Sequence, residues 1–245
     1  MKNILIGHRG EPDSWPENSL TGYRQVLQAG ARFIETDVQI TADGIPVLSH
    51  DPSLLKVTGH NLNVTDTPFD KIRTLPAGYP DRFKDQFDHF RIDTLAAFAD
   101  LLKQWPETRA FVEIKHASVK AFGVEHVVNI MLETLAEVLD QCILISFEYA
   151  ALEYGANNSS LPVGWVLPEW NNENRKQAEA LAPDYLFVNR KRVPAKPEPL
   201  WPGPWQWAVY TVNKADEVPA FLDRGFALVE TNVIRSLLDE AQVDD

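Results

Sequence analysis

The chain has 245 residues, 44% of them hydrophobic, and a formal net charge of −12. This length suits one large domain, and an acidic chain without a basic stretch argues against a nucleic-acid partner. No apolar run approaches the roughly 18 residues that a membrane helix needs, so we expect no integral membrane segment. The N-terminus lacks the pattern of a secretory signal. The only cysteine, Cys142, lies in an apolar run, so we expect a buried thiol and a cytoplasmic location.

Short apolar, strand-like runs alternate with helix-like stretches along the chain. We predict strands at residues 4–7, 33–38, 110–114, 142–146, 162–166, 185–188, 207–212 and 227–230. We predict helices at residues 19–29, 94–104, 119–139, 148–156, 173–181, 214–223 and 233–241. This alternation is typical of βαβ units and a parallel sheet. Eight such units in a chain of this length predict an α/β fold, a TIM (β/α)8 barrel, as a single domain over residues 1–245.

Three segments depart from the alternation. The apolar run 45–49 follows an Asp43-Gly44 turn, and this connection is too short for a parallel crossover, so we expect it to pair antiparallel outside the barrel. Residues 54–91, rich in Thr, Pro, Asp and aromatics, are predicted to form an insertion after the second strand, over the catalytic face. The proline-rich segment 193–204 is expected to replace or shorten the seventh helix.

Charged side chains follow or end several of the predicted strands. His8 and Arg9 follow the first strand, and Glu35 and Asp37 stand two apart on the second, which puts both carboxylates on one face. Glu113 and Lys115 repeat this spacing at the third parallel strand, and the hairpin carrying His50 returns towards the same end. Active sites of TIM barrels form at the carboxyl ends of the strands. We therefore expect all these side chains to converge on one mouth.

Their chemistry indicates a metal and a phosphate. The carboxylates of Glu35, Asp37 and Glu113 would repel one another unless neutralised, and hard oxygen ligands suit Mg²⁺ or Ca²⁺. The imidazoles of His8 and His50 suit a general acid and a general base near neutral pH. The guanidinium and ammonium groups of Arg9 and Lys115 suit the oxygens of a phosphate.

Six motifs in this order also resemble the glycerophosphodiester phosphodiesterase family. They are His8-Arg9-Gly10, Pro16-Glu17-Asn18-Ser19, Glu35-x-Asp37-Val38, Thr41-x-Asp43-Gly44, Val47-x-x-His50-Asp51 and Glu113-Ile114-Lys115. The resemblance implies a TIM barrel that hydrolyses glycerophosphodiesters, small-molecule substrates, to glycerol 3-phosphate and an alcohol. It implies a divalent metal on Glu35, Asp37 and Glu113, phosphate contacts from Arg9 and Lys115, and an acid–base pair of His8 and His50. Which histidine is the acid and which the base does not follow from the sequence, but we expect His50 to protonate the leaving alcohol and His8 to act as the base.

Weaker parallels and departures occur later in the chain. Phe147 and Tyr210 are expected at the substrate rim, and Tyr210 stands where the family usually carries Trp. The family usually shows an Asp-containing turn where this chain reads Glu230-Thr231-Asn232. We expect these residues at the rim too, so that the departures alter substrate fit rather than the chemistry.

Two alternative functions remain open at this stage. One is a phosphodiesterase acting on lysophospholipid-type diesters, for which the chain's many aromatic side chains would form an apolar wall: Tyr79, Phe83, Phe87, Phe90, Trp165, Trp170, Trp201, Trp205 and Trp207. The other is an inactive barrel with a binding role. The alcohol group, the choice of Mg²⁺ or Ca²⁺, the nucleophile (water or a neighbouring hydroxyl) and the oligomeric state do not follow from the sequence.

Overall fold

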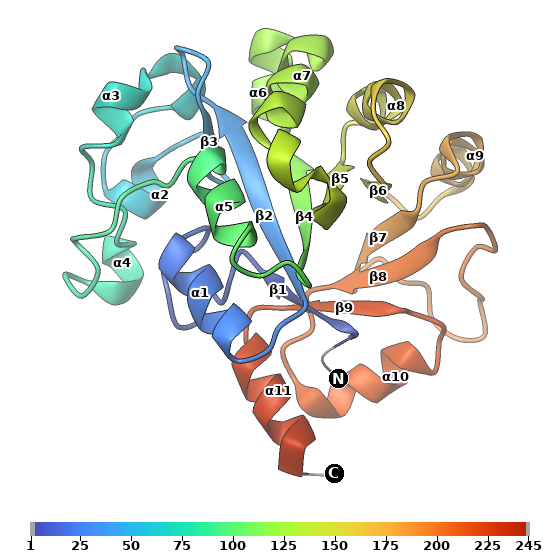
Figure 1. Cartoon of the computed structure of the whole chain (residues 1–245). Coiled ribbons are helices and arrows are strands. Elements are labelled where there is room, and N and C mark those ends of the chain that lie inside the picture. Colours follow the sequence, from blue (N-terminus) through green and yellow to red (C-terminus); the bar gives the residue numbers. More distant parts are fainter. Residues whose placement is uncertain (1–2, 244–245) are drawn as a thin grey trace.

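The computed structural model describes residues 3–243 and shows one closed barrel surrounded by helices (Figure 1). Its sheet has the order β1-β9-β8-β7-β6-β5-β4-β2-β3, and a further pairing of β1 with β2 closes it. All neighbouring strands are parallel except β2 and β3. The strands are β1 (Leu5–His8), β2 (Phe33–Ile40), β3 (Pro46–Leu48), β4 (Arg109–Ile114), β5 (Cys142–Ser146), β6 (Val163–Val166), β7 (Tyr185–Asn189), β8 (Gln206–Tyr210) and β9 (Leu228–Thr231). The predicted TIM barrel and its antiparallel hairpin strand are confirmed.

The α-helices lie outside the barrel strands (Figure 1). They are α1 (Leu20–Gln28), α2 (Leu55–Thr58), α3 (Phe69–Ile72), α4 (Pro80–Phe83), α5 (Leu95–Leu102), α6 (His116–Phe122), α7 (Val124–Thr134), α8 (Tyr149–Asn158), α9 (Asn172–Leu181), α10 (Val218–Leu222) and α11 (Ile234–Val243). Short 3₁₀ helices occupy Val64–Asp66, Ala136–Gln141 and Ala215–Glu217. No helix between residues 3 and 243 combines the length and the apolarity needed to span a bilayer.

Two apolar layers hold the barrel together, because successive side chains of a strand point to opposite faces. The barrel interior is filled by a compact cluster of Ile6, Phe111, Ile143, Ile145, Val166, Phe187, Ala208 and Leu228. The alternate side chains pack outwards against the helices in a much larger cluster, which includes Ile34, Val112 and Leu144. The interior cluster forms the floor below the carboxyl ends of the strands.

One predicted helix, over residues 119–139, is wrong as a single element. The structure has α6, then α7, then a 3₁₀ helix, with a break at Gly123 between the first two. Gly123 has φ +84° and ψ 157°, a conformation that residues with a side chain rarely adopt. The apolar periodicity continued across the glycine, whereas the backbone changes direction there.

The connection from β7 to β8 runs through the proline-rich segment, which contains no helix in the structure, as predicted. Tryptophan rings cover the outer face of β8 instead. Trp201 lies 4.3 Å from Trp170 and 6.0 Å from Trp207 between ring centroids, and Trp205 lies 6.4 Å from Trp207. These side chains therefore serve packing where a helix is missing.

The turn that follows β1 brings the start of α1 against the barrel. Arg9 and Gly10 both have positive φ, +50° and +82°, and a Cβ on Gly10 would lie 3.2 Å from the backbone carbon of Gly22. Only glycine meets both demands without strain. The turn directs the backbone N–H of Arg9 to Glu35 Oε2 at 3.1 Å, so it also shapes the mouth of the barrel.

Candidate active site

The strand register brings the charged residues of the sequence motifs to one level of the barrel. His8 stands opposite Glu35 in the pairing of β1 with β2, and Asp37 stands opposite Glu113 in the pairing of β2 with β4. A cavity of about 220 Å³ opens at this level. It is lined by His8, Arg9, Glu35, His50, Glu113, Lys115, Ile145, Phe147, Val166, Phe187, Asn189, Tyr210, Thr211 and Glu230.

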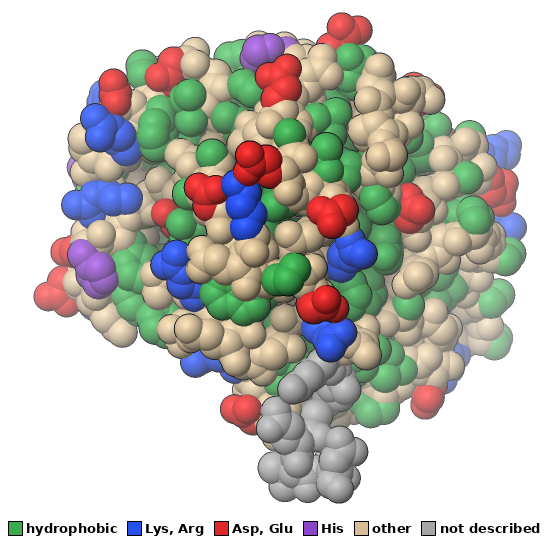
Figure 2. Space-filling model, viewed as in Figure 1, with side chains coloured by type: hydrophobic (Ala, Val, Ile, Leu, Met, Phe, Trp, Pro, Cys, Tyr) green, Lys and Arg blue, Asp and Glu red, His purple; other side chains and the backbone are tan. Residues whose placement is uncertain are grey.

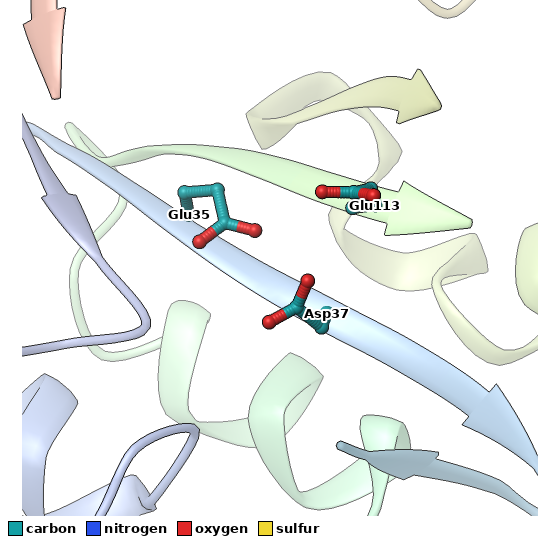
Figure 3. A group of neighbouring side chains, drawn as sticks. All are labelled: Glu35, Asp37 and Glu113. Atoms are coloured by element: carbon teal, nitrogen blue, oxygen red, sulfur yellow. The ribbon is translucent and has the colours of Figure 1, made fainter. Parts of the chain in front are cut away.

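The carboxylates of Glu35, Asp37 and Glu113 face one another across β2 and β4 (Figure 3). One oxygen from each lies within 4.8 Å of the others, and all three side chains are buried. Burial, with repulsion from Asp37 and Glu230, raises the pKa of Glu35 well above its usual value, and burial also raises the pKa of Glu113. Glu35 Oε1 has no hydrogen-bond partner among the described residues. Such a trio is suited to a hard divalent cation.

Arg9 and Lys115 supply the fixed positive charge of the site. Arg9 Nε lies 2.9 Å from Asp37 Oδ2, while Lys115 Nζ lies 3.1 Å from Asp37 Oδ1 and 2.8 Å from Glu113 Oε1. Burial alone would raise the pKa of Asp37, but these two cations outweigh it and hold that pKa well below its usual range. Both cations keep N–H groups beyond these ion pairs, so they can also hold an anion.

His8 is enclosed by the barrel and lies beside the carboxylate trio. Its Nδ1 lies 2.6 Å from Asn232 Oδ1, and its Nε2 lies 3.5 Å from Glu230 Oε1 and 3.9 Å from Glu35 Oε2. Burial, reinforced by the charge of Arg9, lowers the pKa of His8 to about 3. This imidazole is therefore neutral at physiological pH in the metal-free chain.

His50 lies after β3, on the rim of the same cavity. Its Nδ1 lies 2.7 Å from Asp51 Oδ1, and its backbone carbonyl accepts a hydrogen bond from Gln39 Nε2 at 3.1 Å. Partial burial lowers the pKa of His50, while the carboxylates of Asp37 and Asp51 act in the opposite direction. The two imidazoles thus share a cavity but differ in their partners.

Asn18 has a role that the sequence did not reveal. Ser19 caps α1, its Oγ accepting a hydrogen bond from the Gly22 N–H. The buried Asn18 instead donates from Nδ2 to Asp37 Oδ2 at 3.0 Å. Its Oδ1 accepts three hydrogen bonds, from Tyr23 Oη, Thr36 Oγ1 and the Asp37 N–H. Asn18 therefore positions the central carboxylate of the trio.

The expectation that Glu230 lies at the rim is wrong. Glu230 is 4% exposed and lines the cavity, and Asn232 contacts His8. Burial raises the pKa of Glu230 to about 8. The alternation of β9 turns position 230 into the barrel, which only the strand register could reveal. Phe147, 38% exposed, and Tyr210 also line the cavity.

The aromatic side chains of residues 54–91 do not form part of the cavity wall. Phe87 packs against Trp15, Phe83 and Phe90, with ring centroids 5.6, 5.0 and 5.0 Å away, and Tyr79 packs against Phe83 at 6.4 Å. None of Tyr79, Phe83, Phe87 and Phe90 is among the described residues that line the cavity. The apolar wall consists of Ile145, Phe147, Val166 and Phe187.

Comparison with solved structures shows the same fold in known proteins. A phosphodiesterase from Oleispira antarctica, solved in complex with the product sn-glycerol-3-phosphate, matches with a TM-score of 0.83 and 20% identity over 99% of this chain and 97% of that one. A glycerophosphodiester phosphodiesterase from Thermotoga maritima matches with a TM-score of 0.71 and 20% identity, over 97% of each chain.

Sequence comparisons give a consistent result. A glycerophosphodiester phosphodiesterase from Caldanaerobacter subterraneus is 29% identical over 195 residues, 77% of this chain and 78% of that protein. Human glycerophosphodiester phosphodiesterase 1 is 35% identical over 117 residues, which span 47% of this chain and 35% of that protein. The model of the glycerophosphoryl diester phosphodiesterase family matches residues 8–235. The chain therefore belongs to the glycerophosphoryl diester phosphodiesterase family, a family of phosphoric diester hydrolases.

Proposed function

We propose that the protein hydrolyses glycerophosphodiesters to glycerol 3-phosphate and an alcohol in the cavity described above, with a divalent metal and two histidines. The observation that carries the proposal is the convergence of His8, His50, the carboxylate trio, Arg9 and Lys115 on one barrel mouth. The product held by the Oleispira relative, sn-glycerol-3-phosphate, has the chemistry that such a mouth would bind.

The metal would be held by Glu35, Asp37 and Glu113. These residues fit a divalent cation because buried carboxyl groups outnumber the fixed cations: Glu230 adds a fourth carboxyl to the trio, against only Arg9 and Lys115. The unpartnered Glu35 Oε1 offers a free ligand atom. A bound Mg²⁺ or Ca²⁺ would supply Lewis-acid stabilisation of charge on the phosphate.

The remaining groups have separable roles in this proposal. Arg9 and Lys115 bind and orient the phosphate through the N–H groups that their ion pairs leave free. One histidine takes the proton of the attacking hydroxyl, either from water or from a neighbouring hydroxyl of the substrate, and the other returns a proton to the leaving alcohol. Acid–base catalysis of this kind contributes roughly 10²- to 10⁴-fold in rate.

The substrate in this proposal is a small molecule. A cavity of about 220 Å³ suits a glycerophosphate with a short alcohol, with Phe147 and Tyr210 beside the alcohol. A lysophospholipid-type diester is the second candidate, supported by the exposed Phe147 at the rim. The packing of the 54–91 aromatics away from the cavity favours the smaller substrate.

The wider setting of the chain is also part of the proposal. Figure 2 shows lysine and arginine side chains scattered over one face, several beside acidic ones, and the net charge is −12, so we propose no nucleic-acid partner. We further propose that residues 1–245 form one domain in which 54–91 are an insertion, and that it works in the cytoplasm, where the lone, buried Cys142 would remain a thiol.

The test is release of glycerol 3-phosphate from glycerophosphocholine and glycerophosphoethanolamine, with Mg²⁺ or Ca²⁺ and then with EDTA. We expect release with at least one metal, and its loss with EDTA. Release that survives EDTA would overturn the metal's role. A protein that cleaves lysophosphatidylcholine but neither small diester would favour the lipid substrate, and no turnover of any diester would favour an inactive binding barrel.

A further inference from the structure

The imidazole of His8 has two different neighbours on its two nitrogens. Nδ1 lies 2.6 Å from Asn232 Oδ1, and Nε2 faces the cavity beside Glu230 at 3.5 Å. The oxygen of a carboxamide can only accept a hydrogen bond. In this arrangement Nδ1 therefore carries a proton, and Nε2 is the ring nitrogen that faces the cavity.

Asn232 is itself held in place by the turn between β9 and α11. Its backbone N–H donates to Asn213 Oδ1 at 2.9 Å, and Thr231 Oγ1 lies 3.3 Å from the same oxygen. The Val233 N–H donates to Thr231 Oγ1 at 3.2 Å. The carboxamide therefore reaches His8 from a turn with a defined conformation, as expected of a group that orients another.

His50 is held through the same ring nitrogen. Its Nδ1 lies 2.7 Å from a carboxylate oxygen of Asp51. Each of the two imidazoles is thus oriented by one side chain that contacts its Nδ1.

We propose that Asn232 is a positioning residue that holds His8 in the Nδ1–H tautomer, so that Nε2 of His8 faces the cavity. The use of this nitrogen in proton transfer rests on the proposed function, whereas the tautomer of His8 does not.

The tautomer is tested directly by nitrogen NMR of the Mg²⁺-loaded protein labelled with ¹⁵N-histidine. His8→Gln identifies the His8 signals among those of the six histidines. We expect a protonated Nδ1 and an unprotonated Nε2 in the unsubstituted protein, and a shift towards the Nε2–H form in Asn232→Leu and Asn232→Ala. An Nε2–H ring in the unsubstituted protein, or an Nδ1–H ring unchanged in both variants, would overturn the proposal. This readout needs no turnover, so it distinguishes failure of the tautomer from failure of the proposed activity.

Kinetics test the consequence on the substrate that the enzyme turns over. We expect Asn232→Leu to lower kcat by about 100-fold with KM little changed, because proton transfer rather than binding is affected. Asn232→Asp retains an acceptor for Nδ1–H and should recover most of kcat. The matched control is Asn171→Leu, which removes a side chain that caps α9 and lies outside the cavity. Equal losses of kcat in the leucine and aspartate variants, or a fall in kcat as large in Asn171→Leu, would contradict a positioning role.

Discussion

Replacing Asn18 by alanine should destabilise the protein far more than the helix-start position of this residue suggests. The side chain makes four hydrogen bonds: Nδ2 donates to Asp37 Oδ2, and Oδ1 accepts from Tyr23, Thr36 and the Asp37 N–H. Tyr23 has another acceptor, the carbonyl of Glu35 at 3.1 Å, and the Thr36 hydroxyl can rotate. Most of the lost free energy therefore comes from the two hydrogen bonds to Asp37, at its N–H and at its carboxylate.

The magnitude follows from these contacts. Leaving a buried N–H unpaired costs about 1–3 kcal/mol, and the hydrogen bond to a charged carboxylate is worth about 1.5–3 kcal/mol. Asn18 also has φ +57°, where asparagine is tolerated but alanine is strained by about 1–2 kcal/mol. We expect Asn18→Ala to lose about 4 kcal/mol of unfolding free energy, or roughly 10 °C in Tm for a chain of this size.

The assay is urea and thermal unfolding in EDTA, so that no metal contributes. Ser19→Ala is the matched control, because it removes only the cap of α1 and should cost about 1 kcal/mol. If Asn18→Ala loses no more stability than Ser19→Ala, the hydrogen bonds from Asn18 to Asp37 do not stabilise the folded protein. We also expect Asn18→Ala to weaken Mg²⁺ binding in calorimetry, because Asp37 loses the partner that orients it.

Three further outcomes test the site. His8→Ala and His50→Ala should each lower kcat at least about 100-fold. Folding, measured by circular dichroism, and Mg²⁺ affinity, measured by calorimetry, should stay near those of the unsubstituted protein. A near-normal rate in either variant would refute the acid–base role of that histidine. Glu35→Gln should weaken Mg²⁺ binding, and Glu230→Gln should not; equal affinities in both would refute the ligand assignment of Glu35. In EDTA, the folded state keeps a proton on Glu230 to about pH 8, but the unfolded chain loses it near pH 4.5, so stability due to this group falls as pH rises through that window. The unfolding free energy of Glu230→Gln should therefore rise relative to that of the unsubstituted protein between pH 4.5 and 8, and the difference should stay constant above pH 8. The measurement is urea unfolding at a series of pH values. A difference in unfolding free energy that does not change with pH would show that the Glu230 carboxyl is not buried.

Local patterns in the sequence were sufficient to predict the barrel and the charged groups at its mouth. Alternating apolar runs predicted the eight parallel strands, and the two-residue spacing of Glu35 and Asp37 predicted that their carboxylates share a face. The same reasoning failed where one backbone conformation decides the outcome. The helix predicted over 119–139 is interrupted at Gly123, where φ is positive. The prediction missed this break because a periodic apolar pattern carries no information about the φ of a single residue.

Other features depend on contacts between distant residues. Asn18 reads as a helix-start residue, yet its backbone turns the side chain inwards to Asp37, and Asn232 reaches His8 across 224 positions. Glu230 could be assigned to the cavity only from the register of β9 against β1. Local propensity and periodicity determine which elements form, because they act over a few residues. Which side chains meet inside the barrel is decided by closure of the sheet, which fixes the relative heights of strands that are far apart in the chain.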